Sequence, residues 1–127
     1  MDPTQFHQIQ TTRPATLGTR GMVTSPHSLA SAAGVDVLRA GGSAIDAAIA
    51  TSAVLAVVYP HMTGVGGDAF WLIHDGASGD VKYLNGGGKA AATSTLSAME
   101  QRGLKESPLQ GIAPATLTLP GSVDTII

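Results

Sequence analysis

No cysteine occurs among the 127 residues of this chain. Disulfides, thiolate metal sites and cysteine nucleophiles are therefore excluded. Aromatic residues make up only 4% of the sequence, against 43% for all hydrophobic residues, so Ala, Val, Leu and Ile have to form the core. Because these side chains are small and 16 residues are glycine, we expect backbones that pack closely together.

Long runs of charged or apolar residues are also missing. The net charge is −2, and the seven Lys and Arg residues form no basic cluster, which argues against nucleic acid and anionic membranes as partners. The most apolar segment, residues 44–58, has about 15 residues, whereas a membrane span needs roughly 20. Residues 1–20 contain no apolar stretch typical of a secretory signal, so the sequence predicts a soluble, cytoplasmic protein.

The first expected helix begins near Ser25. Serine is a favoured N-cap, and Pro26 fits the first helical position, where its missing N–H leaves no hydrogen bond unmade. Apolar residues then recur on one face at helical spacing. They continue to Gly41 and Gly42, which are typical of a helix end.

A second helix is expected over residues 43–58. Ser43 would cap it, and Asp46, three residues later, would meet free backbone N–H groups and the positive end of the helix dipole. The helix is apolar on nearly every side, which predicts that it is buried, and Pro60 should end it.

A β-hairpin is expected next along the chain. Residues 69–75 form a short apolar run, residues 76–79 contain turn-forming glycines, and residues 80–85 alternate like a strand. Two helices followed by antiparallel strands indicate an α+β fold, in which the apolar helix lies on one face of a sheet.

The rest of the chain is predicted to hold less regular structure. We expect a short strand near residues 21–23, a helix over residues 95–104 and a short strand near residues 116–119. Residues 1–20 lack periodicity and are predicted to form an extended arm. Residues 21–127 would then be the folded part, as an incomplete domain.

The segment TGVGGDAF, residues 63–70, allows two interpretations of its glycines. Phosphate-binding glycine loops lead from a strand into a helix N-terminus, whose dipole attracts the anion. Here the segment leaves a helix and begins a strand, and Asp68 adds a negative charge, so nucleotide binding is disfavoured. We expect instead glycines with positive φ at the helix exit and a close backbone approach at the start of the strand.

Histidines and carboxylates are the other candidates for chemistry. His27 and His61 have no further ligand residues at suitable spacing, so neither a metal nor another cofactor is expected, and His74 is predicted to lie on the surface. Asp46 and Asp68 could form an acid–base pair. Asp46 is better explained by the helix start, and Asp68 by hydrogen bonds to backbone N–H groups near the glycine turn.

Four unusual segments occur in order over residues 21–124, namely GMVTSPHSLAS, LRAGGSAIDAAIAT, VVYPHMTGVGGDAF and LPGSVD. Together they resemble the beginning of the large subunit of the γ-glutamyltransferase (γ-glutamyltranspeptidase) family, whose members are N-terminal-nucleophile hydrolases with αββα layers. The resemblance implies a precursor that cleaves itself to free a Thr. The hydroxyl of that Thr attacks a γ-glutamyl amide, with its own α-amine as base, and the acyl group passes to water, an amino acid or a peptide.

The resemblance also places the nucleophilic Thr far downstream, in the small subunit. None of the threonines in this chain is therefore expected to be catalytic, and the chain is expected to be an N-terminal part of the large subunit that is inactive alone. Its implied partners are the rest of the large subunit, the small subunit and a γ-glutamyl or other acyl amide. After LPGSVD the sequence leaves the family pattern, which suggests a truncation or a frameshift.

The loop LNGGGKAAAT, residues 84–93, departs from the main branch of the family. That branch has an Arg-Glu-x-Ala-Pro motif there, whose Arg holds the α-carboxylate of the substrate. Gly87 or Gly88 falls near the Arg position, and Lys89 follows one or two residues later, as in the acylase branch with Gly-x-Gly-Arg-Ala-Pro but with Lys for Arg. By resemblance Lys89, with Gly87 and Gly88, is the candidate substrate-binding site. The alternative is a solvated loop lysine.

This departure bears on the substrate, because Lys lacks the bidentate fork with which Arg holds a carboxylate. A cephalosporin-type or glutaryl-type amide is therefore an alternative to a γ-glutamyl substrate. A different hypothesis is a non-catalytic family remnant that acts as a small binding or interaction module. Such a module would have to cover the apolar helix 43–58 with its own residues, and we expect the isolated chain to expose apolar surface and associate.

Overall fold

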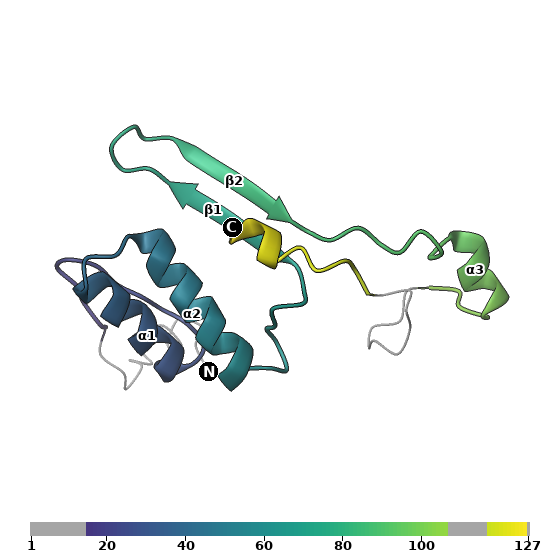
Figure 1. The fold of residues 1–127 in the computed structure, drawn as a ribbon, viewed down its shortest axis with the longest axis horizontal. Helices are drawn as coiled ribbons and strands as arrows, with labels where there is room; N and C mark the ends of the chain where they lie inside the picture. Colours follow the sequence, from purple (N-terminus) through teal and green to yellow (C-terminus); the bar gives the residue numbers. More distant parts are fainter. Residues whose placement is uncertain (1–14, 107–116, 127) are drawn as a thin grey trace, which may run out of the picture.

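The structure is a computed structural model that describes residues 15–106 and 117–126. Within these ranges the elements follow in the order α1 (Ser28–Arg39), α2 (Ala44–Val58), β1 (Ala69–His74), β2 (Val81–Gly86), α3 (Leu96–Gln101) and the 3-10 turn η3 (Val123–Thr125) (Figure 1). The predicted α+β class, with a helix pair followed by an antiparallel hairpin, is confirmed.

Helix α1 begins later than the sequence predicts. Its N-cap is His27, whose Nδ1 accepts a hydrogen bond from the Leu29 N–H at 3.2 Å. The Ser25 hydroxyl instead donates to the His27 carbonyl at 2.8 Å and lies 2.8 Å from the Ser31 hydroxyl. Pro26 therefore precedes the helix. The prediction of a Ser25 cap was wrong because the histidine ring satisfies the helix end and leaves the serine for other partners.

Helix α2 begins as predicted. The Ser43 hydroxyl accepts a hydrogen bond from the Asp46 N–H at 3.2 Å, and the Asp46 carboxylate accepts one from the Ser43 N–H at 2.8 Å. The Ser43 hydroxyl also donates a hydrogen bond to Asp46 Oδ2 at 2.7 Å. Hydrogen bonds from the Ser43 side chain, and then from its backbone, hold the pKa of Asp46 below its ordinary value of 3.8. Gly41, at φ 90°, separates the two helices.

Helices α1 and α2 pack against each other through small residues (Figure 1). Ala30 is fully buried and Ala47 is 2% exposed. A Cβ on Gly34 would overlap the Thr51 hydroxyl and lie 2.8 Å from Val23 Cγ1. The Thr51 hydroxyl donates to the Ala47 carbonyl at 2.7 Å, so this buried polar group is satisfied. The close backbone packing expected from the composition therefore occurs between these helices.

Strands β1 and β2 form a two-stranded antiparallel sheet, with Ala69 opposite Gly86 and His74 opposite Val81. Their bounds lie within one residue of the prediction. Gly79, at φ 77°, allows the tight turn between them. One face of the hairpin is apolar and uncovered by the described residues. The four apolar residues of this face, between 60% and 76% exposed, are Phe70, Leu72, Val81 and Tyr83. His74 and Asn85, opposite Val81 and Phe70, lie on the same face.

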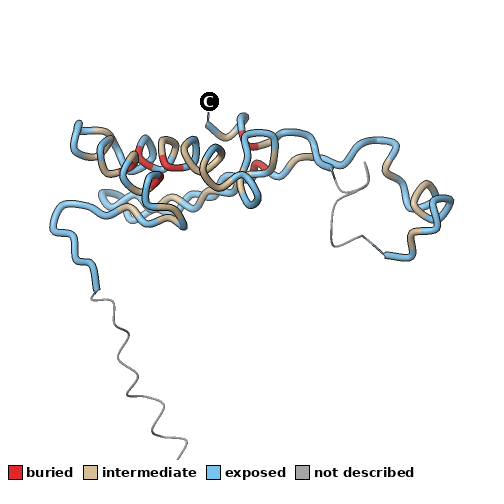
Figure 2. The backbone as a smooth tube through the Cα atoms, turned by 90° about the horizontal axis from the view of Figure 1, so that it is seen from below, coloured by how far each residue is buried: buried red, intermediate tan, exposed pale blue. Residues whose placement is uncertain are grey.

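Among the described residues, burial is confined to two places, which Figure 2 shows in red. The buried residues are Ala30, Gly34, Ala47 and Thr51 in the helix pair, and Gly86 and Ser122 where the chain passes the end of β2. The prediction that α2 is buried all round is wrong for the described chain, since Val57 is 77% exposed. Within residues 15–106 and 117–126, the hairpin packs mainly on itself and on η3 and does not form a layer that covers α2.

The remaining predictions met mixed outcomes. Residues 21–23 form no strand, whereas α3 lies within the helix predicted over 95–104, with Thr95 as its N-cap. The strand expected near residues 116–119 is reduced to a single bridge between Ala90 and Thr118. Residues 15–20 are exposed without helix or strand, and the rest of the predicted arm lies outside the described residues. None of the described helices has the length and hydropathy needed to cross a bilayer.

Candidate functional site

The glycine loop, residues 86–89, begins at Gly86, the last residue of β2. Gly86 makes the last pair of the sheet, with Ala69, and is buried. A Cβ on Gly86 would overlap Thr125 Cγ2 and lie 2.7 Å from the Ala69 carbonyl oxygen, so no side chain fits there. The Gly87 N–H then donates to Asn85 Oδ1 at 2.9 Å, a turn that takes the chain out of the sheet.

The LPGSVD segment lies against the glycine loop, although it is close to the other end of the chain (Figure 1). The Leu119 N–H donates to the Lys89 carbonyl at 2.9 Å. A Cβ on Gly88 would overlap the Leu119 carbonyl oxygen, and a Cβ on Gly121 would overlap that of Gly86. The two segments therefore meet backbone to backbone, which requires glycine on both sides.

Asp68 joins the glycine loop to the same segment. Its Oδ1 accepts one hydrogen bond from the Gly88 N–H and one from the Thr118 hydroxyl, each at 2.8 Å. The Gly88 bond first, and the Thr118 bond second, hold the pKa of Asp68 below its ordinary value of 3.8. The expectation that Asp68 accepts a backbone N–H is confirmed, but the donor comes from the glycine loop, 20 residues away.

Two further hydrogen bonds fasten the LPGSVD segment and η3 to the start of the hairpin. The Ser122 N–H donates to the Gly67 carbonyl at 2.9 Å. The Trp71 indole N–H donates to the Thr125 hydroxyl at 3.1 Å, and the Thr125 hydroxyl in turn donates to the Ser122 carbonyl at 2.8 Å. Sequence reasoning missed Ser122, Thr125 and Thr118. The one sequence signal at this place was the LPGSVD motif itself.

The glycines of the TGVGGDAF segment do not adopt the positive φ predicted for them, although Gly67 does contact another backbone, through its carbonyl and the Ser122 N–H. Positive φ among the described glycines occurs at Gly41, Gly79 and Gly103. A Cβ on Gly64, Gly66 or Gly67 would have no atom within 4 Å of it. The chain instead leaves α2 through Tyr59, whose N–H still bonds to Leu55. The LPGSVD backbone therefore contacts the start of the strand at Gly67, as predicted, but the contacts that leave no room for a Cβ lie at Gly86 and Gly88.

Lys89 projects from a loop that is fixed on both sides. Its side chain is exposed. Within residues 15–106 and 117–126, Arg39 and Asp36 form an ion pair, and Lys89 forms none. An exposed ammonium on a held backbone can meet the carboxylate of a small molecule. The predicted role of Lys89, Gly87 and Gly88 in substrate binding stays a prediction.

The histidines have structural contacts of their own. His27 caps α1, and the ring centroid of His61 lies 4.2 Å from that of Tyr59, at an interplanar angle of 58°. His74 is exposed at the end of β1. In the described part of the chain, no three His, Asp or Glu residues converge to hold a metal ion.

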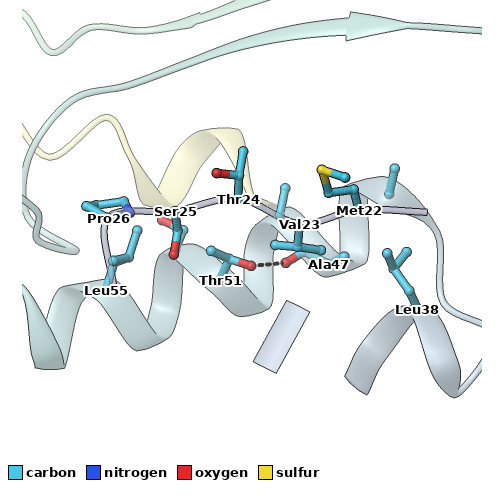
Figure 3. Close-up of a pocket in the computed structure, with 12 residues that line it drawn as sticks. Met22, Val23, Thr24, Ser25, Pro26, Leu38, Ala47, Thr51 and Leu55 are labelled. Atoms are coloured by element: carbon cyan, nitrogen blue, oxygen red, sulfur yellow. Dashed lines mark hydrogen bonds between the residues drawn. The ribbon is translucent and has the colours of Figure 1, made fainter. Parts of the chain in front are cut away.

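A separate groove of about 370 Å³ runs between the extended segment 22–26 and α2 (Figure 3). Val23, Leu38 and Leu55 line it, and the Thr51 hydroxyl in its wall is already bonded to Ala47. Among the residues that the structure describes, no titratable side chain and no member of the glycine loop lines this groove. It therefore offers packing surface and no acid–base chemistry.

The helix pair, the hairpin and the glycine loop define an α+β unit. The family model of gamma-glutamyltranspeptidase matches residues 30–126. The chain therefore belongs to the gamma-glutamyltranspeptidase family, and the resemblance noted from the sequence is confirmed.

Three known proteins illustrate this relationship. The chain is 50% identical, over 86% of its length, to a glutathione hydrolase-like YwrD proenzyme of Bacillus subtilis, of which it spans 20%. The gamma-glutamyltranspeptidase of Helicobacter pylori has a TM-score of 0.74 at 34% identity, over 89% of this chain and 32% of that one. The cephalosporin acylase of Bacillus halodurans has a TM-score of 0.68 at 33% identity, over 94% and 23% of the two chains.

Proposed function

We propose that this chain is the N-terminal part of the precursor of a γ-glutamyltransferase-like enzyme, which transfers or hydrolyses a γ-glutamyl or related acyl amide. The match of residues 30–126 to the family carries the proposal. The chain spans about a fifth of the length of its Bacillus subtilis relative, so the nucleophilic Thr would lie in the remainder. This part supplies scaffold and one wall of the substrate cleft.

Lys89 is proposed as the group that binds the substrate carboxylate, with Gly87 and Gly88 shaping the loop around it. Hydrogen bonds hold the backbone just before and just after the Lys89 α-carbon, which reduces the conformational freedom lost on binding. A lysine ammonium is a point charge and imposes no bidentate geometry. It can therefore pair with the carboxylate of a γ-glutamyl group or of a glutaryl group.

The rest of the large subunit and the small subunit are the proposed protein partners. Their proposed contact surface includes the apolar hairpin face, Phe70, Leu72, Val81 and Tyr83, which the described residues leave exposed. An uncovered apolar face of this kind favours association with a partner layer. It counts against the alternative of a self-standing interaction module.

The test begins by reading the DNA downstream of the Ile127 codon in all three frames. If one frame continues the family pattern to a Thr at a cleavage point, the complete protein is assayed with a γ-glutamyl anilide and a glutaryl amide side by side. Lys89→Gln should raise KM about fivefold with little change in kcat, as expected for the loss of an exposed ion pair. The matched control is Lys82→Gln, an exposed lysine within β2.

Each outcome decides a different part of the proposal. An unchanged KM for Lys89→Gln would remove Lys89 from the substrate site while leaving the enzyme class intact. A complete, self-cleaved protein that turns over neither amide would contradict the proposed activity. If all three frames close at once, the chain holds no nucleophile and the non-catalytic module becomes the working hypothesis.

A further inference from the structure

We infer that Asp68 is a positioning residue, which holds the glycine loop closed and thereby sets where the Lys89 ammonium stands. The effect on substrate rests on the proposed function of Lys89. The closure of the loop does not, because it depends only on contacts within this chain.

One carboxylate oxygen makes both contacts that close the loop. Asp68 Oδ1 accepts from the Gly88 N–H and from the Thr118 hydroxyl, each at 2.8 Å. Gly88 directly precedes Lys89, and the Lys89 carbonyl accepts from the Leu119 N–H at 2.9 Å. The Lys89 backbone is thus fastened on its N-terminal side to Asp68 and on its C-terminal side to the LPGSVD segment.

Asp68 supplies the acceptor at the point where the chain leaves the sheet. Strand β2 ends at Gly86, so the Gly88 N–H has no partner in the sheet and bonds to Asp68 instead. No side chain at Gly88 can substitute, since a Cβ there would overlap the Leu119 carbonyl oxygen. A carboxylate makes stronger hydrogen bonds than a neutral acceptor, so it holds a short loop that makes few other contacts.

The negative charge of Asp68 would repel a substrate anion bound to Lys89. The charge of Asp68 and its role as a hydrogen-bond acceptor can therefore be tested separately. Asp68→Asn keeps an acceptor oxygen but removes the charge, whereas Asp68→Ala removes both. If Asp68 acts by holding the loop, the asparagine variant retains most of the wild-type behaviour. If it acts through its charge, the two variants behave alike.

The first measurement is amide hydrogen exchange on the 127-residue chain, which needs no substrate. Asp68→Ala should speed exchange at Gly88 by about tenfold, the change expected for a lost charge-assisted hydrogen bond, and Asp68→Asn by less. The matched control is Asp75→Ala, whose carboxylate accepts from the Ala77 N–H at 2.9 Å in the hairpin turn. It should change exchange at Ala77 and leave Gly88 unaffected.

Exchange at α2 amides reports whether any variant loses its fold. If α2 keeps its protection and Gly88 exchanges at the wild-type rate in Asp68→Ala, the inference is overturned. If α2 loses protection in the alanine variant, Asp68→Asn decides instead, because retained protection at Gly88 is expected there and its loss would contradict an acceptor role.

The second measurement uses the complete enzyme and separates KM from kcat. Asp68→Ala should raise KM about as much as Lys89→Gln, with kcat within about twofold, and Asp68→Asn should restore most of the loss. The double variant Asp68→Ala/Lys89→Gln should be little worse than Lys89→Gln alone, because both changes remove one interaction. Additive effects would show that Asp68 does not act through Lys89. If no variant turns over either amide, the proposed function fails, and the exchange experiment still decides the loop closure.

Discussion

Gly88 and Leu119 lie in direct backbone contact, and a Cβ on Gly88 would overlap the Leu119 carbonyl oxygen. Next to this contact the Leu119 N–H bonds to the Lys89 carbonyl at 2.9 Å. The glycine loop, which carries the candidate substrate-binding lysine, therefore meets the LPGSVD segment from the other end of the chain. At this contact the Gly88 α-carbon has room only for a hydrogen atom.

Gly88→Ala should lower the free energy of unfolding by about 2 kcal/mol, because the added methyl forces the two backbones apart. Gly66→Ala is the matched control, since no atom lies within 4 Å of its Cβ position and its φ is not positive; its effect should stay within about 0.5 kcal/mol. Urea unfolding followed by circular dichroism measures both. Equal losses in the two variants would contradict the contact.

Gly34→Val should destabilise the helix pair by about 2 kcal/mol, because the new side chain collides with the Thr51 hydroxyl and with Val23. Ala32→Val is the control on the same helix, at an exposed position, where only helix propensity changes, by about 0.5 kcal/mol. Thermal unfolding followed by far-ultraviolet circular dichroism, which reports helix content, compares them. A Gly34→Val protein as stable as the control would rule out close packing at this crossing.

Acid should destabilise the chain through three carboxylates. Hydrogen bonds from Ser43, Gly88 and Ala77 are the main causes that lower the pKa of Asp46, Asp68 and Asp75, respectively, below 3.8. A lowered folded-state pKa means that the unfolded chain binds protons first, so this stabilisation is present above the unfolded-state pKa and is lost as pH falls through the folded-state pKa.

The melting temperature, measured from about pH 6 to about pH 2, should therefore fall below about pH 4. Asp46→Asn should flatten this decline at the expense of stability at neutral pH. High salt serves as a control, because it screens general charge repulsion while leaving short hydrogen bonds largely in place. A decline that salt abolishes would attribute the acid effect to net charge and not to these contacts.

Leu72→Lys should increase the monomer fraction of the isolated chain, because it places a charge in the middle of the apolar hairpin face. Leu72 is 76% exposed and lies opposite Tyr83, which is 60% exposed. Ala77→Lys adds the same charge in the hairpin turn, away from this face. Light scattering after size exclusion measures both. An equal shift for the two variants would mean that net charge controls association.

Sequence reasoning succeeded where the deciding contacts are local. The capping box of Ser43 and Asp46 spans three residues, and both of its hydrogen bonds formed as predicted. The hairpin bounds were found because alternation and turn glycines are local features. The start of α1 was missed even though it is local, because Ser25 and His27 both offer acceptors: the His27 ring caps the helix, and Ser25 bonds to Ser31 and to the His27 carbonyl.

The sequence by itself determined the α+β class, the capped second helix, the hairpin and the family, since short-range patterns and ordered motifs carry them. Only the tertiary structure decided which glycines must be glycine and what Asp68 binds. The partners of Asp68 lie 20 and 50 residues away, and periodicity carries no information on such pairs. Gly86, Gly88 and Gly121 have to be glycine because another backbone touches them, and that contact exists only after the LPGSVD segment has folded back against the end of β2.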